Sequence, residues 1–259
     1  MPTHRRPLIA LAAAAAGAMA ITASFAAGAE SATPQQRTAG TTGAKEYRQL
    51  AKKADYVKLD LLAINDFHGN LEPPTGSSGR INNTSAGGAA YLASVLNKER
   101  KKSRAAGAQP LTVAAGDLIG ASPLLSGAFH DEPTIKAMNQ MHLDVTSVGN
   151  HEFDEGYKEL QRLAHGGCID DGDGLNNQNS CPDGSFAGAD FDYLAANVKY
   201  AGTDETILPA YTVKNVKGAK IGFIGMTLED TPSIVTASGV AGLEFDDEVA
   251  TANALVPVL

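Results

Sequence analysis

Three short polar clusters in the sequence carry residue types that bind metal ions. Asp66 and His68 lie two residues apart, Asp117 follows a glycine, and Asn150 directly precedes His151. Each cluster alone could be an ordinary turn. Together they offer carboxylate, imidazole and amide groups without thiolates, a combination that suits zinc, manganese or iron(II). We therefore predict that Asp66, His68, Asp117 and Asn150 hold two divalent metal ions, with zinc or manganese preferred.

Hydrolysis of a phosphate ester is the chemistry that such a site would support. Two divalent cations about 4 Å apart can stabilise the attacking and leaving oxygens, and a bridging carboxylate, here Asp117, offsets their repulsion. The predicted nucleophile is a metal-bound hydroxide. His151 would stabilise the transition state or protonate the leaving oxygen, and Asp154 would orient the imidazole. Glu152 and Phe153 are interpreted as structural.

The three clusters each follow an apolar run of strand length, at 57–65, 111–115 and 145–148. In layered α/β folds the loops beyond the carboxyl ends of neighbouring parallel strands converge on one crevice. We therefore expect an α/β (α+β layered) domain in which the clusters meet. The other expected elements are helices at 89–102, 134–141, 156–165 and 246–256, and strands at 193–198, 211–216 and 220–226, with a tight turn at Lys217-Gly218.

The segments LDLLAINDFHGNL at 59–71 and VGNHEFD at 148–154 resemble the two signatures of the 5′-nucleotidase family of metallophosphoesterases. The GGAAYLA segment from Gly87 and IGFIGMTLEDTP from Ile221 are similar to that family as well, whereas Leu143 departs from its second signature. The resemblance implies an αββα sandwich and hydrolysis of nucleotide phosphate esters. It also implies that Asp66, His68, Asp117 and Asn150 are metal ligands and that His151 and Asp154 are the catalytic dyad.

The resemblance also implies that further ligands come from later segments of the same domain, generally histidines. No histidine follows His165 in this sequence, so we expect residues 57–259 to be a truncated metallophosphoesterase domain without the family's C-terminal nucleotide-binding domain. His130, His142 and His165 could substitute, but none follows a predicted strand. The alternative is an inactive exported fragment, or a non-enzymatic binding domain with only a half metal site.

The N-terminal residues 1–29 are typical of a signal peptide. Arg5 and Arg6 precede an uncharged Ala-rich stretch at 8–27, and Ala27-Gly28-Ala29 is a small-x-small cleavage site. An uncleaved membrane anchor is the alternative, and the arginine pair leaves a twin-arginine export route open. We expect a flexible linker at 30–56, a secreted or periplasmic protein, and no stable membrane association after cleavage.

Two cysteines, Cys168 and Cys181, lie in a polar stretch at 166–185. In an exported protein their spacing favours a disulfide over two free thiols, and the bond would stabilise the fold by about 3 kcal/mol. The Asp-rich run at 170–174 could suggest a calcium loop. However, Leu175 stands where that loop would need an oxygen ligand, so solvated turns are expected instead.

The overall charge argues against a nucleic acid polymer as a partner. The 259 residues carry a net charge of −8, the wrong sign for a protein that binds nucleic acid through lysines and arginines. We therefore expect a nucleotide or another phosphate ester as substrate, no nucleic acid polymer, and bound metal ions that neutralise the phosphate.

Overall fold

The computed structural model describes residues 56–259, apart from 77–78 and 170–179, and all of these belong to one unit, Ala54–Leu259. The predicted signal peptide, most of the predicted linker and the Asp-rich run lie outside the described residues. Along the chain the elements are β1 (Leu59–Ile64), β2 (Arg80–Ile81), β3 (Thr84–Ser85), α2 (Ala89–Ala105), β4 (Gln109–Ala114), α3 (Leu124–Gly127), α4 (Glu132–Gln140), β5 (Val145–Ser147), η1 (His151–Phe153), α5 (Tyr157–His165), β6 (Asp192–Leu194), β7 (Val198–Tyr200), β8 (Tyr211–Val216), β9 (Ala219–Ile224), α6 (Thr231–Ile234), β10 (Leu243–Phe245), α7 (Glu248–Leu255) and η2 (Val256–Val258).

A four-stranded parallel sheet with the strand order β1, β4, β5, β6 is the centre of the fold. β1 and β4 pair in register from Leu59 with Gln109 to Ile64 with Ala114. Val145 of β5 pairs both with Val113 of β4 and with β6. Since the strands are parallel, their carboxyl ends lie at the same edge of the sheet, and the loops that follow them can meet there.

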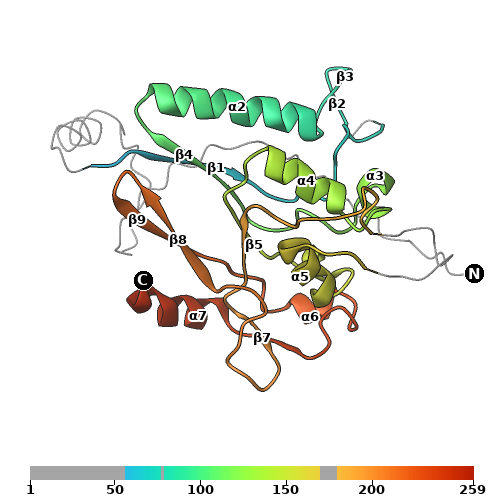
Figure 1. Cartoon of the computed structure of the whole chain (residues 1–259), viewed down its shortest axis with the longest axis vertical. Helices are drawn as coiled ribbons and strands as arrows, with labels where there is room; N and C mark the ends of the chain where they lie inside the picture. The colour runs from blue at the N-terminus through green and yellow to red at the C-terminus, as the bar shows by residue number, and fades with distance from the viewer. Residues whose placement is uncertain (1–55, 77–78, 170–179) are drawn as a thin grey trace, which may run out of the picture. The chain divides into compact units, whose positions relative to one another are not determined.

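Helices α2 and α4 lie on one side of this sheet (Figure 1). α2 contacts β1 and β4, and its buried Arg100 donates from Nε to the hydroxyl of Thr112 in β4 at 3.1 Å. α4 buries Ile135 and Met138 in the hydrophobic core. Both helices begin and end within a few residues of the predicted positions, because their apolar residues recur at helical spacing.

The β8–β9 hairpin and α7 lie on the other side of the sheet (Figure 1). Lys217 and Gly218, which join β8 to β9, both have positive φ, as the predicted tight turn requires. The ammonium of Lys214 in β8 lies 2.9 Å from the carboxylate of Asp192 in β6, so it ties the hairpin to the sheet. The resulting order of helix, sheet, hairpin and helix confirms the predicted α/β layered class.

The strand expected at 193–198 is wrong as a single element. β6 ends at Leu194, and β7 begins only at Val198 and pairs with β10 instead of the parallel sheet. The turning point is the fully buried Asn197, whose amide donates to the carbonyls of Thr227 and Asp246. These partners are far away in sequence, so local periodicity does not reveal the break.

Cys168 and Cys181 form the predicted disulfide, with their Cα atoms 5.6 Å apart. The N–H of Cys181 also donates to Oε1 of the buried Glu132 at the start of α4 (2.9 Å). Within the part of the chain that the structure describes, no helix is long and apolar enough to cross a lipid bilayer.

Candidate metal centre

The loops after β1 and β4 continue the pairing of their strands. The N–H of Asp66 donates to the carbonyl of Gly116 at 3.3 Å, and the N–H of His68 donates to the carbonyl of Asp117 at 3.1 Å. Two segments about 50 positions apart in the chain are therefore held side by side by backbone hydrogen bonds. Asp66 and His68 consequently lie next to Asp117, as the sequence predicts.

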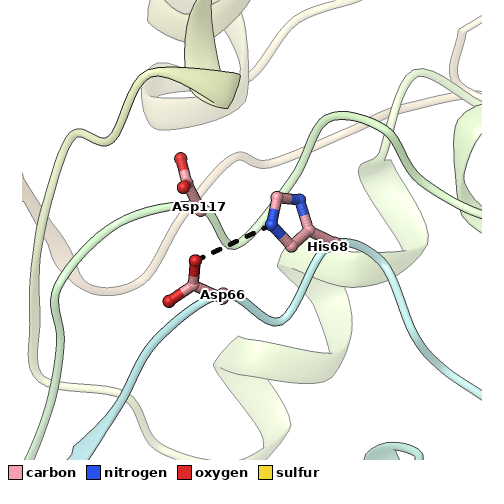
Figure 2. Close-up of side chains that lie close together, drawn as sticks. All are labelled: Asp66, His68 and Asp117. Carbon is pink, nitrogen blue, oxygen red and sulfur yellow. Dashed lines mark ion pairs between the residues drawn. The ribbon is translucent and has the colours of Figure 1, made fainter. Parts of the chain in front are cut away.

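Asp66, His68 and Asp117 each offer a ligand atom, and these atoms all lie within 4.8 Å of one another. Figure 2 shows the three side chains close together on two neighbouring loops. Nε2 of His68 lies 3.9 Å from Oδ1 of Asp66. The φ angles of the three residues are 52°, 45° and 50°. Non-glycine residues rarely adopt this left-handed conformation, and such strained positions concentrate at functional sites.

The ring of His68 is oriented by a backbone carbonyl. Its Nδ1 lies 2.9 Å from the carbonyl oxygen of Gly120, which can only accept a hydrogen bond. The proton of a neutral imidazole is therefore assigned to Nδ1, and Nε2 keeps the lone pair that a metal ion needs. One imidazole and two carboxylates, all partly exposed and close together, are a donor set that fits a divalent ion such as zinc or manganese.

Glu152 joins the loop after β4 to the loop after β5. Its buried carboxylate accepts hydrogen bonds from the N–H groups of Asp117 (2.9 Å), Leu118 (2.8 Å) and Gly149 (2.6 Å). Burial raises the pKa of Glu152 to about 7, and the charge of Asp117 adds to this rise, while the backbone donors oppose it. The structural interpretation of Glu152 agrees with this position. That its carboxylate fastens two site loops together was not predicted.

His151 and Asp154 lie together beside the metal-ligand cluster. Nδ1 of His151 is 2.9 Å from Oδ2 of Asp154, and the same oxygen accepts the N–H of Ala121 at 3.0 Å. The hydrogen bond to Asp154 is the main reason that the pKa of His151 is raised, against the opposing effect of burial. The His151 ring also packs edge-on against His68, with the ring centroids 4.8 Å apart. A protonated imidazole is thus favoured next to the cluster.

Asn150 immediately precedes His151, whose N–H donates to Oδ1 of Asp117 at 3.0 Å. The loop that carries Asn150 is therefore fastened to Asp117, while its amide forms no hydrogen bond to any residue that the structure describes. The preceding Gly149 makes this approach possible. A Cβ atom at that position would lie 2.3 Å from Oδ1 of Asp117.

The three other described histidines are not members of the Asp66, His68 and Asp117 group. His130 lies between α3 and α4, with Nδ1 2.6 Å from Oε2 of Glu155. His142 is exposed just after α4, and His165 is the last residue of α5. As the sequence suggests, none of them follows a strand of the parallel sheet.

Asp131 is a supporting residue that the sequence did not reveal. It is buried, and its Oδ2 accepts the N–H of Gly120 at 3.2 Å. Gly120 is also the residue whose carbonyl orients His68. Asp131 precedes α4, where an aspartate is common as an N-cap, so no local signal separates this role from ordinary capping.

The chain is similar to proteins from bacteria and from snake venom. An uncharacterized protein of Acinetobacter calcoaceticus is 45% identical over 170 residues, 62% of this chain and 79% of that protein. Endonuclease YhcR of Bacillus subtilis is 36% identical over 80% of this chain and 16% of that protein. Snake venom 5′-nucleotidase of Crotalus adamanteus is 30% identical over 77% of this chain and 30% of that protein. The chain thus spans less than a third of the length of the last two relatives.

A solved structure supports the same relationship. The NAD nucleotidase of Haemophilus influenzae superimposes with a TM-score of 0.57 and 28% sequence identity, over 78% of this chain and 32% of that one. No model of a protein family matches the sequence. Nevertheless, the Acinetobacter calcoaceticus protein is matched along 79% of its length. Nucleotidases also recur among the curated relatives and the solved structures. The chain therefore belongs to the 5′-nucleotidase family of metallophosphoesterases.

Proposed function

We propose that the chain is the N-terminal catalytic portion of an exported phosphoesterase that hydrolyses nucleotide phosphate esters with two divalent metal ions, zinc or manganese. The observation that carries this proposal is the convergence of three loops. They place Asp66, His68 and Asp117 within 4.8 Å of one another and the ring of His151 4.8 Å from that of His68. A phosphate held at the metal ligands would therefore lie next to the His151–Asp154 dyad.

The metal ligands in this proposal are Asp66, His68, Asp117 and Asn150. Divalent ions at this position supply the charge that neutralises a phosphate and the acidity that activates a water molecule. His68 offers Nε2 because its Nδ1 is bound to Gly120. Asp117 can serve as the ligand that both ions share. The backbone N–H of His151 donates only to Oδ1 of Asp117, so the remaining lone pairs of the carboxylate stay available.

The dyad holds the proton that the leaving group needs. The Nδ1–H of His151 is bound to Asp154, so the Nε2 proton of the imidazolium is the one available to the leaving oxygen of the ester. Asp154 raises the pKa of His151 and therefore favours this protonated form. Its second hydrogen bond, from the N–H of Ala121, keeps the carboxylate in place and so fixes the ring plane.

Nucleotides are the proposed substrates because the relatives include a 5′-nucleotidase and an NAD nucleotidase. The net charge of −8 argues against binding of a nucleic acid polymer. Export is proposed from the signal-like residues 1–29, and residues 57–259 are proposed to be one part of the metallophosphoesterase domain.

The test combines elemental analysis of bound metal with phosphate release from AMP in added Mn²⁺ or Zn²⁺. The chain is expected to hold two ions at the candidate metal centre and to release phosphate, whereas Asp117→Ala is expected to hold two fewer ions than the unmodified chain and to lose activity. Asp60→Ala, which removes an exposed carboxylate from β1, serves as the control and retains both. Two ions retained in Asp117→Ala would refute the bridging role. At most one weakly bound ion and no turnover in the unmodified chain would favour the half-site alternative.

A further inference from the structure

A second group of ligand-type side chains lies in a cavity that the dyad also lines. The cavity has a volume of about 440 Å³ and is lined by His151 and Asp154, but not by Asp66, His68 or Asp117. Its remaining walls come from the segment after β4, from the α3–α4 region and from the start of α5. The side chains of His130, Glu155 and Glu159 have no role in the proposed reaction.

His130, Glu155 and Glu159 form the group. Each offers one ligand atom, and the three atoms lie within 4.8 Å of one another. Adjacent ligand atoms at about 2.1 Å from a tetrahedral ion lie about 3.4 Å apart, so atoms at the 4.8 Å limit would have to approach one another by more than about 1 Å. Glu155 is exposed, and its carboxylate lies 2.6 Å from Nδ1 of His130, a contact that a shared ion would replace.

Two buried carboxylates near the group, those of Asp131 and Glu132, each have one oxygen without a hydrogen-bond partner among the described residues. Asp131 lines the cavity and is 5% exposed, and its Oδ1 has no hydrogen-bond partner among the residues that the structure describes. The neighbouring Glu132 is fully buried, and within the same part of the chain its Oε2 has none either. The other oxygen of each carboxylate does accept a hydrogen bond, from the N–H of Gly120 to Asp131 and from Arg162 to Glu132. A buried carboxylate oxygen without a partner is costly, and a cation nearby would lower that cost.

Arg162 only partly compensates these acids. It pairs with Glu132 at 2.7 Å and with Glu159 at 2.6 Å, and among the described residues no other lysine or arginine pairs with Asp131, Glu132, Glu155 or Glu159. The guanidinium thus pairs with two of these four carboxylates, and Glu155 is hydrogen-bonded to His130. The excess of negative charge favours a bound cation, since a divalent ion would offset most of it.

From this geometry we propose that a divalent transition-metal cation binds His130, Glu155 and Glu159 in the cavity beside the dyad. An imidazole with two carboxylates suits Mn²⁺ or Zn²⁺ better than Ca²⁺, which prefers oxygen ligands alone. The bonds from Arg162 to Glu159 do not exclude this role, because they occupy three of about four lone-pair positions on that carboxylate. The site is separate from the catalytic one and does not depend on the proposed activity.

The ion would join the segment between α3 and α4 to the start of α5. His130 lies between α3 and α4, Glu155 directly follows the dyad residue Asp154, and Glu159 is in the first turn of α5. Binding would therefore hold the dyad loop against α5 and raise the unfolding temperature, as any ligand of the native state does.

The test measures Mn²⁺ bound to the full chain in which Asp117→Ala has removed the candidate catalytic ions. After chelation and titration with Mn²⁺, this variant is expected to bind about one ion and to unfold at a higher temperature with Mn²⁺ than without. Adding His130→Gln and Glu155→Gln is expected to weaken that binding at least about tenfold. The electron spin-echo signal of a nitrogen ligand on Mn²⁺ should disappear with His130→Gln.

His142→Gln and Glu205→Gln, at exposed positions outside the cavity, are the matched controls and leave the binding unchanged. No bound ion in folded Asp117→Ala, or equal binding with and without His130→Gln and Glu155→Gln, would overturn the proposal. If Asp117→Ala does not fold, the comparison is made in the unmodified chain. In the unmodified chain, His130→Gln with Glu155→Gln is expected to lower the number of bound Mn²⁺ ions by one while AMP hydrolysis persists. An unchanged number of bound Mn²⁺ ions would refute the site.

Discussion

The side chains of the candidate metal centre depend on backbone groups of neighbouring loops. The carbonyl of Gly120 decides which nitrogen of His68 carries a lone pair, and the N–H of His151 occupies one oxygen of Asp117. Each of these contacts crosses between segments that follow different strands. At the scale of single residues, the orientations of the His68 ring and the Asp117 carboxylate are therefore fixed by hydrogen bonds to backbone groups.

Replacement of His151 by alanine is expected to lower kcat for AMP hydrolysis by about 10² to 10⁴, the usual contribution of a general acid or base. The metal content should stay unchanged, because the N–H that binds Asp117 belongs to the backbone. Steady-state kinetics with elemental analysis on His151→Ala and the exposed control His142→Ala measure both quantities. A loss of metal that accompanies the loss of activity would show that His151 acts as a ligand instead.

The buried Glu152 predicts a pH dependence of stability in the metal-free chain. Its pKa is about 7 in the folded protein against an ordinary value of 4.5. The folded state thus holds an extra proton between these values, so the contribution of Glu152 to stability is fully present below pH 4.5 and is lost as the pH rises to about 7. The loss amounts to about 3 kcal/mol. Urea denaturation in the presence of a chelator measures it.

Glu152→Gln provides the comparison for that measurement. Glutamine does not titrate, so the difference in unfolding free energy between the two proteins should change across pH 4.5 to 7. It should stay constant outside that range. A difference that is the same at every pH would mean that Glu152 ionises normally in the folded chain.

At the scale of elements, the close approach of two loops makes Gly149 a position where any side chain is costly. A Cβ atom there would lie 2.3 Å from Oδ1 of Asp117 and 2.7 Å from its backbone nitrogen. Gly149→Ala is expected to weaken metal binding and to cost about 1 to 3 kcal/mol of stability. Gly222→Ala in β9 meets only the flexible side chain of Leu259 at 3.2 Å and should cost less. Metal titration and urea denaturation compare them, and equal effects would contradict the argument.

Most elements that carry the site could be predicted because their signals are local. Apolar runs mark β1, β4 and β5, and the polar residues directly after them fall at one edge of the sheet by topology alone. Asp66, His68 and Asp117 are accordingly close together, as predicted. The break before β7 was missed because Asn197 is held by partners distant in sequence. For the same reason Asp131 was missed, since its partner Gly120 gives no pattern in the sequence.

At the scale of the whole molecule, the excess of acidic residues favours nucleotides over nucleic acid polymers as substrates. The chain has 29 aspartates and glutamates against 21 lysines and arginines. A long polyanion would be repelled by this surface, whereas a single phosphate needs only the local charge of bound metal ions. The similarity to endonuclease YhcR covers only 16% of that protein. Cleavage of a nucleic acid polymer is therefore tested directly.

Supercoiled plasmid DNA is therefore expected to remain intact under conditions in which the metal-loaded chain releases phosphate from AMP. Gel electrophoresis of the plasmid after incubation with Mn²⁺ or Zn²⁺ gives the result, and Asp117→Ala serves as the control for contaminating nucleases. Nicking by the unmodified chain that disappears in Asp117→Ala would show that the site also accepts a nucleic acid polymer.

The carboxylate of Glu152 should slow amide hydrogen exchange in two loops of the site. The N–H groups of Asp117, Leu118 and Gly149 all donate to it, and the N–H of His68 donates to the carbonyl of Asp117. These loop amides should exchange with deuterated solvent as slowly as amides within the parallel strands. Because one buried side chain holds several of them, they should also become exchangeable together, in a single opening event. The loops of the site would then behave as part of the rigid sheet instead of as independent surface segments.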